Sequence, residues 1–363
     1  MDRRQFIFSL AGAAGGLLAG PAGRRLTVDQ AKADEPGLSA NDQPIIDAHT
    51  HPHNFCITDL SSVSEGDKYT LAQMTSANVV EACFCAVGDL YFRHNNPNNA
   101  ASVHDCVLKQ LNVVKGWARA RKVELILDVN ELIAHTTSSP PGAILGVEGC
   151  DWLEDNLSRV TEAYDNGVRS MTLMHKRTNE LGDYQTGETV NGGLTDFGRQ
   201  VVQTMNSLGM IIDVTHSDHQ TLMDVLETSG KPVIDSHTSL VPVWYPPSEP
   251  GRFRNWEEME AVAAAGGLVC TWPIKITAAP DYTGRETLAD WAAEIVAMKE
   301  HLGMEHVGLG TDGAGGLPGL VDGYQNAADL PKLRQAMVEA GLSGEDIAAY
   351  FGGNFIRFFQ AQA

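Results

Sequence analysis

The chain of 363 residues is poor in positive charge. It carries 26 lysines and arginines against 46 aspartates and glutamates, so its formal net charge is −20. Nucleic acids and anionic membrane surfaces are bound by basic faces, and neither is therefore an expected partner. The simplest interpretation of the acidity is that it keeps the protein soluble. We expect the partner to be a small-molecule substrate.

Cysteine is also scarce, with six residues and no Cys-x-x-Cys pair. Cys83 and Cys85 alternate in an apolar run, which would place both thiols on one face of a strand. In an oxidising compartment a disulfide could form, with Cys56 or Cys106 as candidate partners, but the connectivity does not follow from sequence. Most of the six are expected to be small buried residues.

Long hydrophobic runs are lacking as well. The apolar stretch at 9–20 is too short and too rich in glycine to span a membrane comfortably. It follows Arg3-Arg4, and a twin arginine before such a stretch resembles a bacterial export signal. A small-x-small site ends at Ala33, so residues 1–33 are predicted to direct the protein to the periplasm or out of the cell. Residues 34–43 form a linker, and 44–363 a single domain.

The rest of the chain alternates short apolar runs with helical patterns. Predicted strands begin near residues 44, 79, 143, 168, 209, 232, 267 and 306. Predicted helices cover 68–77, 103–121, 154–166, 195–208, 218–229, 255–265, 288–302 and 328–340. A shorter strand-like run at 123–127 precedes Asp128, which could cap a further helix. Strands alternating with helices form a parallel sheet, and eight of them predict an α/β fold, the (β/α)8 TIM barrel.

Most of these strands lead to a potential metal ligand. His49 and His51 follow Ile45-Ile46, and side chains at i and i+2 of a strand share a face, so both could bind one ion. The other residues that end predicted strands are Glu148, His175, His216, His237 and Asp312. Each alone could be an ordinary loop, turn or capping residue. Seven of them at the carboxyl ends of successive strands, where TIM barrels carry their catalytic groups, predict a metal site.

Two divalent ions held close together need an anionic ligand between them. No lysine ends a strand where it could form a carbamate bridge, so Glu148 is the candidate bridging ligand. His49 and His51 would then complete the shell of one ion, and His216 and His237 that of the other. A water shared by the ions would be deprotonated near neutral pH and act as nucleophile. Asp312, after the last strand, could accept and return its proton.

Several stretches between residues 45 and 359 resemble the renal or membrane dipeptidase family, the M19 metallopeptidases. This resemblance implies a (β/α)8 hydrolase of dipeptides with two zinc ions bridged by Glu148. It also implies that His175 faces the substrate and steadies the oxyanion, and that Arg254 binds the substrate's terminal carboxylate. Arg254 could instead be a surface charge of its loop. The stretches that carry the resemblance are 146–149, 171–175, 212–216, 232–239, 254–255, 307–312 and 353–359.

Two departures from the family pattern leave alternatives open. The family has His-x-Asp at the first strand where this chain has His49-Thr50-His51, which is closer to the broader amidohydrolase pattern. The family also has a second aspartate where Gly313 follows Asp312. The leading hypothesis is an exported zinc-dependent dipeptidase, with a homodimer as one assembly to consider. Alternatives are an amidohydrolase of another amide, lactam or lactone, and an inactive metal-binding barrel, against which the retained Glu148 and Asp312 speak.

Overall fold

The computed structural model describes residues 44–51, 69–89, 102–135, 140–240, 251–277 and 284–363. The predicted export signal at 1–33 and the linker at 34–43 lie outside these ranges and stay predictions. Within the described ranges, no helix is long and apolar enough to cross a membrane.

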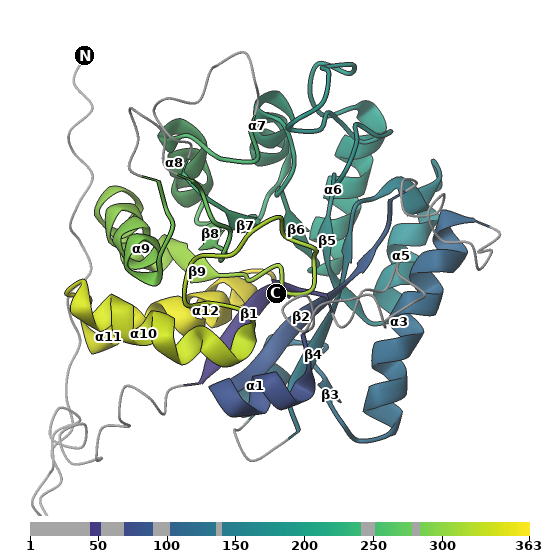
Figure 1. Ribbon diagram of the computed structural model, residues 1–363. Helices are drawn as coiled ribbons and strands as arrows, with labels where there is room; N and C mark the ends of the chain where they lie inside the picture. Colours follow the sequence, from purple (N-terminus) through teal and green to yellow (C-terminus); the bar gives the residue numbers. More distant parts are fainter. Residues whose placement is uncertain (1–43, 52–68, 90–101, 136–139, 241–250, 278–283) are drawn as a thin grey trace, which may run out of the picture. The chain divides into compact units, whose positions relative to one another are not determined.

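Eight strands form a parallel barrel in chain order (Figure 1). They are β1 (Ile45–Thr50), β2 (Val79–Val87), β4 (Gly142–Glu148), β5 (Val168–Thr172), β6 (Ile211–Asp213), β7 (Ile234–Thr238), β8 (Leu268–Thr271) and β9 (Val307–Leu309). The ring closes just beyond β9, where the Asp312 N–H donates to the His49 carbonyl oxygen at 2.9 Å and the His51 N–H donates to that of Gly313 at 2.8 Å. The predicted (β/α)8 barrel is therefore confirmed.

The strand-like run at 123–127 forms only the two-residue strand β3 (Glu124–Leu125). It pairs with β4 at Gly142 and Ala143 and lies outside the ring. Asp128 caps the helix that follows, as predicted: its Oδ1 accepts from the N–H groups of Asn130 and Glu131. The eight strands of the barrel are thus the eight that the sequence predicts.

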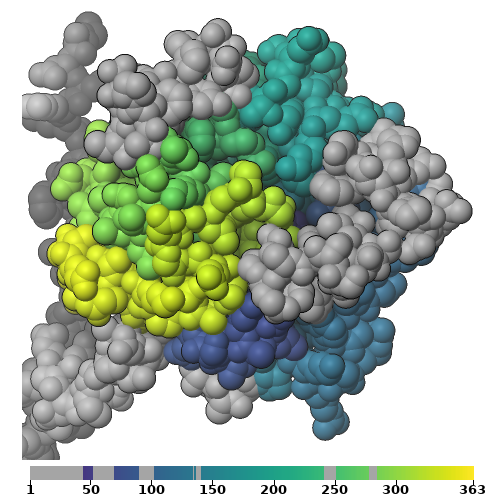
Figure 2. Space-filling model, in the orientation of Figure 1, coloured from purple at the N-terminus to yellow at the C-terminus, as the bar shows by residue number. Residues whose placement is uncertain are grey.

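Helices surround the barrel and cover its outer face (Figure 1). They are α1 (Leu71–Ala77), α3 (Val103–Arg119), α4 (Val129–Ala134), α5 (Ser158–Asp165), α6 (Asp196–Leu208), α7 (His219–Thr228), α8 (Trp256–Ala264), α9 (Leu288–Leu302), α10 (Leu330–Glu339), α11 (Gly344–Ala348) and α12 (Asn354–Gln360). Figure 2 shows the yellow C-terminal part of the chain beside the dark blue surface of α1, so the first and last parts of the barrel lie side by side. The short helical turn Ala327–Asp329, just before α10, contacts α1 there.

Local sequence explains where α6 begins and ends. The Thr195 side chain accepts from the Gly198 N–H at its start, an N-cap that stabilises a helix by about 1 kcal/mol. Val201, Val202 and Met205 are fully buried against the barrel. The helix ends at Gly209, whose φ of 70° is left-handed backbone that glycine adopts without a steric penalty. By contrast, α5 begins later than predicted because Glu154 and Asp155 have positive φ.

The barrel interior is filled from the end opposite the predicted metal site. Side chains near the amino ends of the strands cluster with three phenylalanines of α12, namely Phe355, Phe358 and Phe359. The five described cysteines are buried, and Cys83, Cys85 and Cys270 belong to this cluster. The expectation that most cysteines are small buried residues is confirmed for these five, and Cys56 lies outside the described residues. The polar side chains of the interior lie at the carboxyl end of the barrel.

Candidate metal centre

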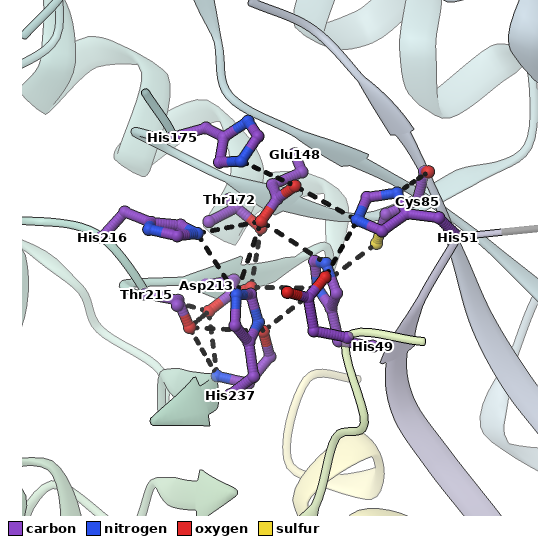
Figure 3. A network of polar contacts seen from close by, with 12 residues as sticks. His49, His51, Cys85, Glu148, Thr172, His175, Asp213, Thr215, His216 and His237 are labelled. Atoms are coloured by element: carbon purple, nitrogen blue, oxygen red, sulfur yellow. Dashed lines mark hydrogen bonds and ion pairs between the residues drawn. The ribbon is translucent and has the colours of Figure 1, made fainter. Parts of the chain in front are cut away.

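The centre of the site is the carboxylate of Glu148, the last residue of β4 (Figure 3). Its Oε1 lies 2.9 Å from His216 Nε2 and 3.5 Å from His237 Nε2. On the same side, His49 Nε2 is 3.6 Å away. The second oxygen, Oε2, lies 3.2 Å from His51 Nε2. One carboxylate therefore faces imidazoles from strand ends on both sides of it.

Asp312 completes the cluster from beyond β9. Its Oδ1 lies 3.2 Å from His51 Nε2. The residue has a φ of 46°, and its N–H is fixed by the bond to the His49 carbonyl oxygen described above. Three residues later, a Cβ on Gly315 would lie 2.0 Å from Asp312 Oδ1, so a larger residue at position 315 would displace the carboxylate. The glycine-rich turn after Asp312 therefore leaves room for its carboxylate.

The donor atoms fall into two groups that share one residue. His49, His51, Glu148 and Asp312 offer ligand atoms within 4.8 Å of one another, and so do Glu148, His216 and His237. All six are buried. The His49 Nε2 atom is buried and has no hydrogen-bond partner among the described residues, although it faces the carboxylate. Imidazole and carboxylate donors of this kind fit two divalent ions with Glu148 between them.

The charges in the cluster support ligation. Burial alone would raise the pKa of Glu148, but the imidazoles of His175 and His49, with further hydrogen bonds, hold it well below its usual 4.5. Burial lowers the pKa values of His216 and His237 far below 6.5, so both rings are neutral and have a lone pair to donate.

His51 behaves differently. Burial opposes its protonation, but the carboxylates of Asp312 and Glu148, which accept hydrogen bonds from the ring, outweigh that effect and raise its pKa to about 10. A cation binding at His51 Nε2 must therefore displace a proton.

The far nitrogens of three of the ligand rings are also held in place. His51 Nδ1 donates to the Cys85 carbonyl oxygen at 2.8 Å. The Ser236 hydroxyl lies 3.1 Å from His49 Nδ1 and 3.0 Å from His237 Nδ1, so it orients one ring from each ligand group. Such contacts fix ring orientation and tune the ligands of a metal site.

Asp213, the last residue of β6, organises this second layer (Figure 3). Its carboxylate accepts from the hydroxyls of Thr172, Thr215 and Ser236 at 2.7, 2.7 and 2.6 Å, and from the N–H of Thr215 and of Ser236. Its Oδ2 is 3.8 Å from His49 Nδ1. Sequence reasoning missed Asp213 as a site residue, although an acid that ends an apolar strand was a visible signal.

His175, which follows β5, lies at the edge of the cluster with its Nε2 3.3 Å from Glu148 Oε2. Its Nδ1 lies 2.8 Å from Asp89 Oδ2. That oxygen also accepts from the Lys176 N–H at 3.1 Å, so Asp89 fixes both the ring and the backbone after it. Sequence reasoning missed Asp89 too, and the signal was an acid two residues beyond β2. The aspartate orients the imidazole so that Nε2 points into the site.

Arg254 is buried and only 1% exposed. Its Nε donates to Asp235 Oδ2 at 2.8 Å, and its two terminal nitrogens donate to the carbonyl oxygens of Ser217 and Val214, each at 2.7 Å. The alternative that Arg254 is a surface charge is therefore wrong. All three guanidinium nitrogens already bond to the chain, and the role in substrate binding stays a prediction.

The fold and the cluster together define a class. A parallel eight-stranded barrel with histidines, a glutamate and an aspartate at the carboxyl ends of its strands is typical of metal-dependent hydrolases. The sequence profile described as "Membrane dipeptidase (Peptidase family M19)" matches residues 40–363. The chain belongs to this family, as its motifs predict.

Individual relatives agree with this assignment. The dipeptidase tcpJ of Claviceps purpurea is 28% identical over 246 residues, which are 65% of this chain and 54% of that protein. The dipeptidase aclJ of Aspergillus oryzae is 30% identical over 234 residues, or 62% and 53% of the two chains. The match thus spans about half the length of these relatives. A metallopeptidase from Rhodobacter sphaeroides, solved with a phosphinate mimic of L-Ala-D-Ala, shares the fold (TM-score 0.74, 17% identity, 89% and 100% covered).

Proposed function

We propose that the protein is a zinc-dependent dipeptidase whose residues hold two ions bridged by Glu148. The observation that carries the proposal is the shared position of this carboxylate, which belongs to both groups of donor atoms. His49 and His51 would bind the first ion, and His216 and His237 the second. Divalent ions in such a site polarise a carbonyl group and make water a nucleophile at neutral pH. The dipeptidase relatives and the family assignment support a peptide bond as the target.

The chain's own residues supply the proton transfers and orientation. Asp312 faces the cluster, and although burial opposes its ionisation, the imidazoles of His237 and His51 hold its pKa at about 2. It is therefore a carboxylate at neutral pH, able to take a proton from the attacking water and pass it to the leaving amine. His175, oriented by Asp89, directs its Nε2 into the site and would donate a hydrogen bond to the oxyanion that forms on the carbonyl.

A panel of dipeptides tests the function directly. The zinc-loaded protein is assayed with dipeptides that have L- or D-residues at the second position, beside a sample stripped with chelator and a third sample to which zinc is returned. We expect cleavage that chelation abolishes and zinc restores. Absence of dipeptide cleavage by a protein that binds two zinc ions would contradict the proposal.

A second candidate is an amidohydrolase that acts on another amide, a lactam or a lactone. It is favoured by His51, an imidazole where the family has an aspartate, which leaves the first ion's shell less anionic. If the dipeptide panel fails while zinc binds, cyclic amides and lactones are the next substrates.

We also propose export, on the basis of Arg3-Arg4 and the apolar stretch after them. Replacing both arginines by lysine should retain the protein in the cytoplasm of a bacterial host, as measured by cell fractionation. An unchanged distribution would count against a twin-arginine signal.

A further inference from the structure

The residue that the family motif suggests for carboxylate binding is already engaged. Arg254 bonds to Asp235 and to two carbonyl oxygens, and its guanidinium is also 3.5 Å from Glu258. A substrate carboxylate could reach it only by displacing these bonds, and Asp235 would then lose its cation in a buried place. Breaking a buried pair of this kind is strongly unfavourable. Arg254 therefore ties the segment after β7 to the barrel.

Arg252, two residues earlier, has no ion-pair partner among the described residues. Its Cζ lies 5.0 Å from the centre of the Trp272 ring, a distance at which a cation is attracted to the face of an indole. Among the described residues, no carboxylate lies within ion-pair distance of its guanidinium, whereas Arg254 has two. The side chain is half-buried. It is thus braced by an aromatic ring, and its hydrogen-bond donors have no partner among the described residues.

This arginine lies beside the metal cluster. The Trp272 ring that braces it is 5.2 Å from the His237 ring, and its Nε1 donates to Ser239 Oγ at 2.9 Å, which fixes the indole. The backbone is tethered as well: Gln185 Nε2 donates to the Phe253 carbonyl oxygen at 2.8 Å, and the Gln185 N–H donates to that of His216 at 2.7 Å.

We propose that Arg252, and not Arg254, is the residue that binds the carboxylate of the substrate, with Trp272 holding its guanidinium beside the ion bound by His216 and His237. The inference rests on the proposed function, because a dipeptide has a free carboxylate one residue beyond the bond to be cleaved. A guanidinium forms paired, charge-assisted hydrogen bonds to a carboxylate. It would therefore select dipeptides that end in an acid over the same molecules that end in an amide.

The experiment compares an acid with its amide. Calorimetry measures the binding of a phosphinate dipeptide mimic with a free carboxylate, and of its C-terminal carboxamide, to the zinc-loaded protein. Kinetics on a dipeptide and its carboxamide run in parallel. The variants are Arg252→Gln, Arg252→Lys, Arg254→Lys and, as a matched surface control, Arg199→Gln in α6. Charge-assisted hydrogen bonds are worth about 10- to 100-fold in affinity.

We expect Arg252→Gln to weaken binding of the acid by about 10- to 100-fold and to leave binding of the amide unchanged, so that the preference between them disappears. Arg252→Lys should retain part of the preference for the acid. Arg254→Lys should lower the thermal midpoint of unfolding but keep the preference in the folded protein. Arg199→Gln should keep the preference as well. A full preference in Arg252→Gln, or its loss in Arg254→Lys alone, would overturn the inference.

The two proposals can fail separately. If the wild type cleaves dipeptides but Arg252→Gln keeps the preference for the acid, the assignment of Arg252 is wrong and the dipeptidase proposal stands. If the wild type cleaves no dipeptide yet binds the acid mimic through Arg252, the function is wrong and the carboxylate site stands.

Discussion

Removal of the Asp213 carboxylate should destabilise the fold and loosen the metal centre together. In Asp213→Ala, the Thr172 hydroxyl and the Thr215 N–H each lose the one acceptor that the structure gives them. The hydroxyls of Thr215 and Ser236 keep other partners. An unpaired buried donor costs about 1–3 kcal/mol, so the two together lower the free energy of unfolding by about 2–6 kcal/mol.

Denaturant unfolding of the metal-free protein measures the free energy of unfolding, and zinc titration measures the affinity of the metal centre. Asp213 orients His49 both directly and through Ser236, so zinc affinity should fall by about 10- to 100-fold. Asp213→Asn keeps the size of the side chain and one acceptor oxygen, so it should lower the free energy of unfolding less than Asp213→Ala does. The control is Asp196→Ala on the exposed start of α6, expected within about 0.5 kcal/mol of the wild type. An Asp213→Ala protein as stable as this control would refute the reasoning.

Three further predictions concern other carboxylates. Asp312→Asn should retain two zinc ions by metal analysis but lose at least about 100-fold in turnover, and near-normal turnover would exclude Asp312 as the proton carrier. Glu148→Gln should reduce the bound zinc below two ions per chain, because the two donor groups no longer share an anion, and full zinc content would rule out the bridge. Burial raises the pKa of Glu81 to about 8, so the native state holds a proton that the unfolded chain loses above about pH 4.5. Wild-type stability should therefore fall as pH rises from about 4.5 to about 8 and level off above that. Glu81→Gln should gain more over the wild type near pH 9 than near pH 6 in denaturant unfolding, and an equal difference at both pH values would contradict this.

The order of strands and helices was predictable because it depends on local patterns of apolar residues. A strand such as β4 is a mainly apolar run buried on both faces, and such runs are visible without any knowledge of their neighbours. Errors arose where the backbone departs from the pattern. Positive φ at Glu154 and Asp155 delays α5. The helix α12 was not predicted, although Phe355, Phe358 and Phe359 have helical spacing and fill one end of the barrel.

Sequence by itself determined which candidate ligands gather at one end of this protein, because a residue that follows a parallel strand must emerge at the carboxyl end of the barrel, where the other strands also end. It could not determine which side chains pair with one another. Asp213 joins residues of three strands, Asp89 reaches His175 across 86 positions of the chain, and Arg254 is drawn inward by Asp235 while Arg252 is left beside the metal centre. Hydrogen bonds and ion pairs act over a few ångströms of space, and the fold alone decides which distant residues come that close.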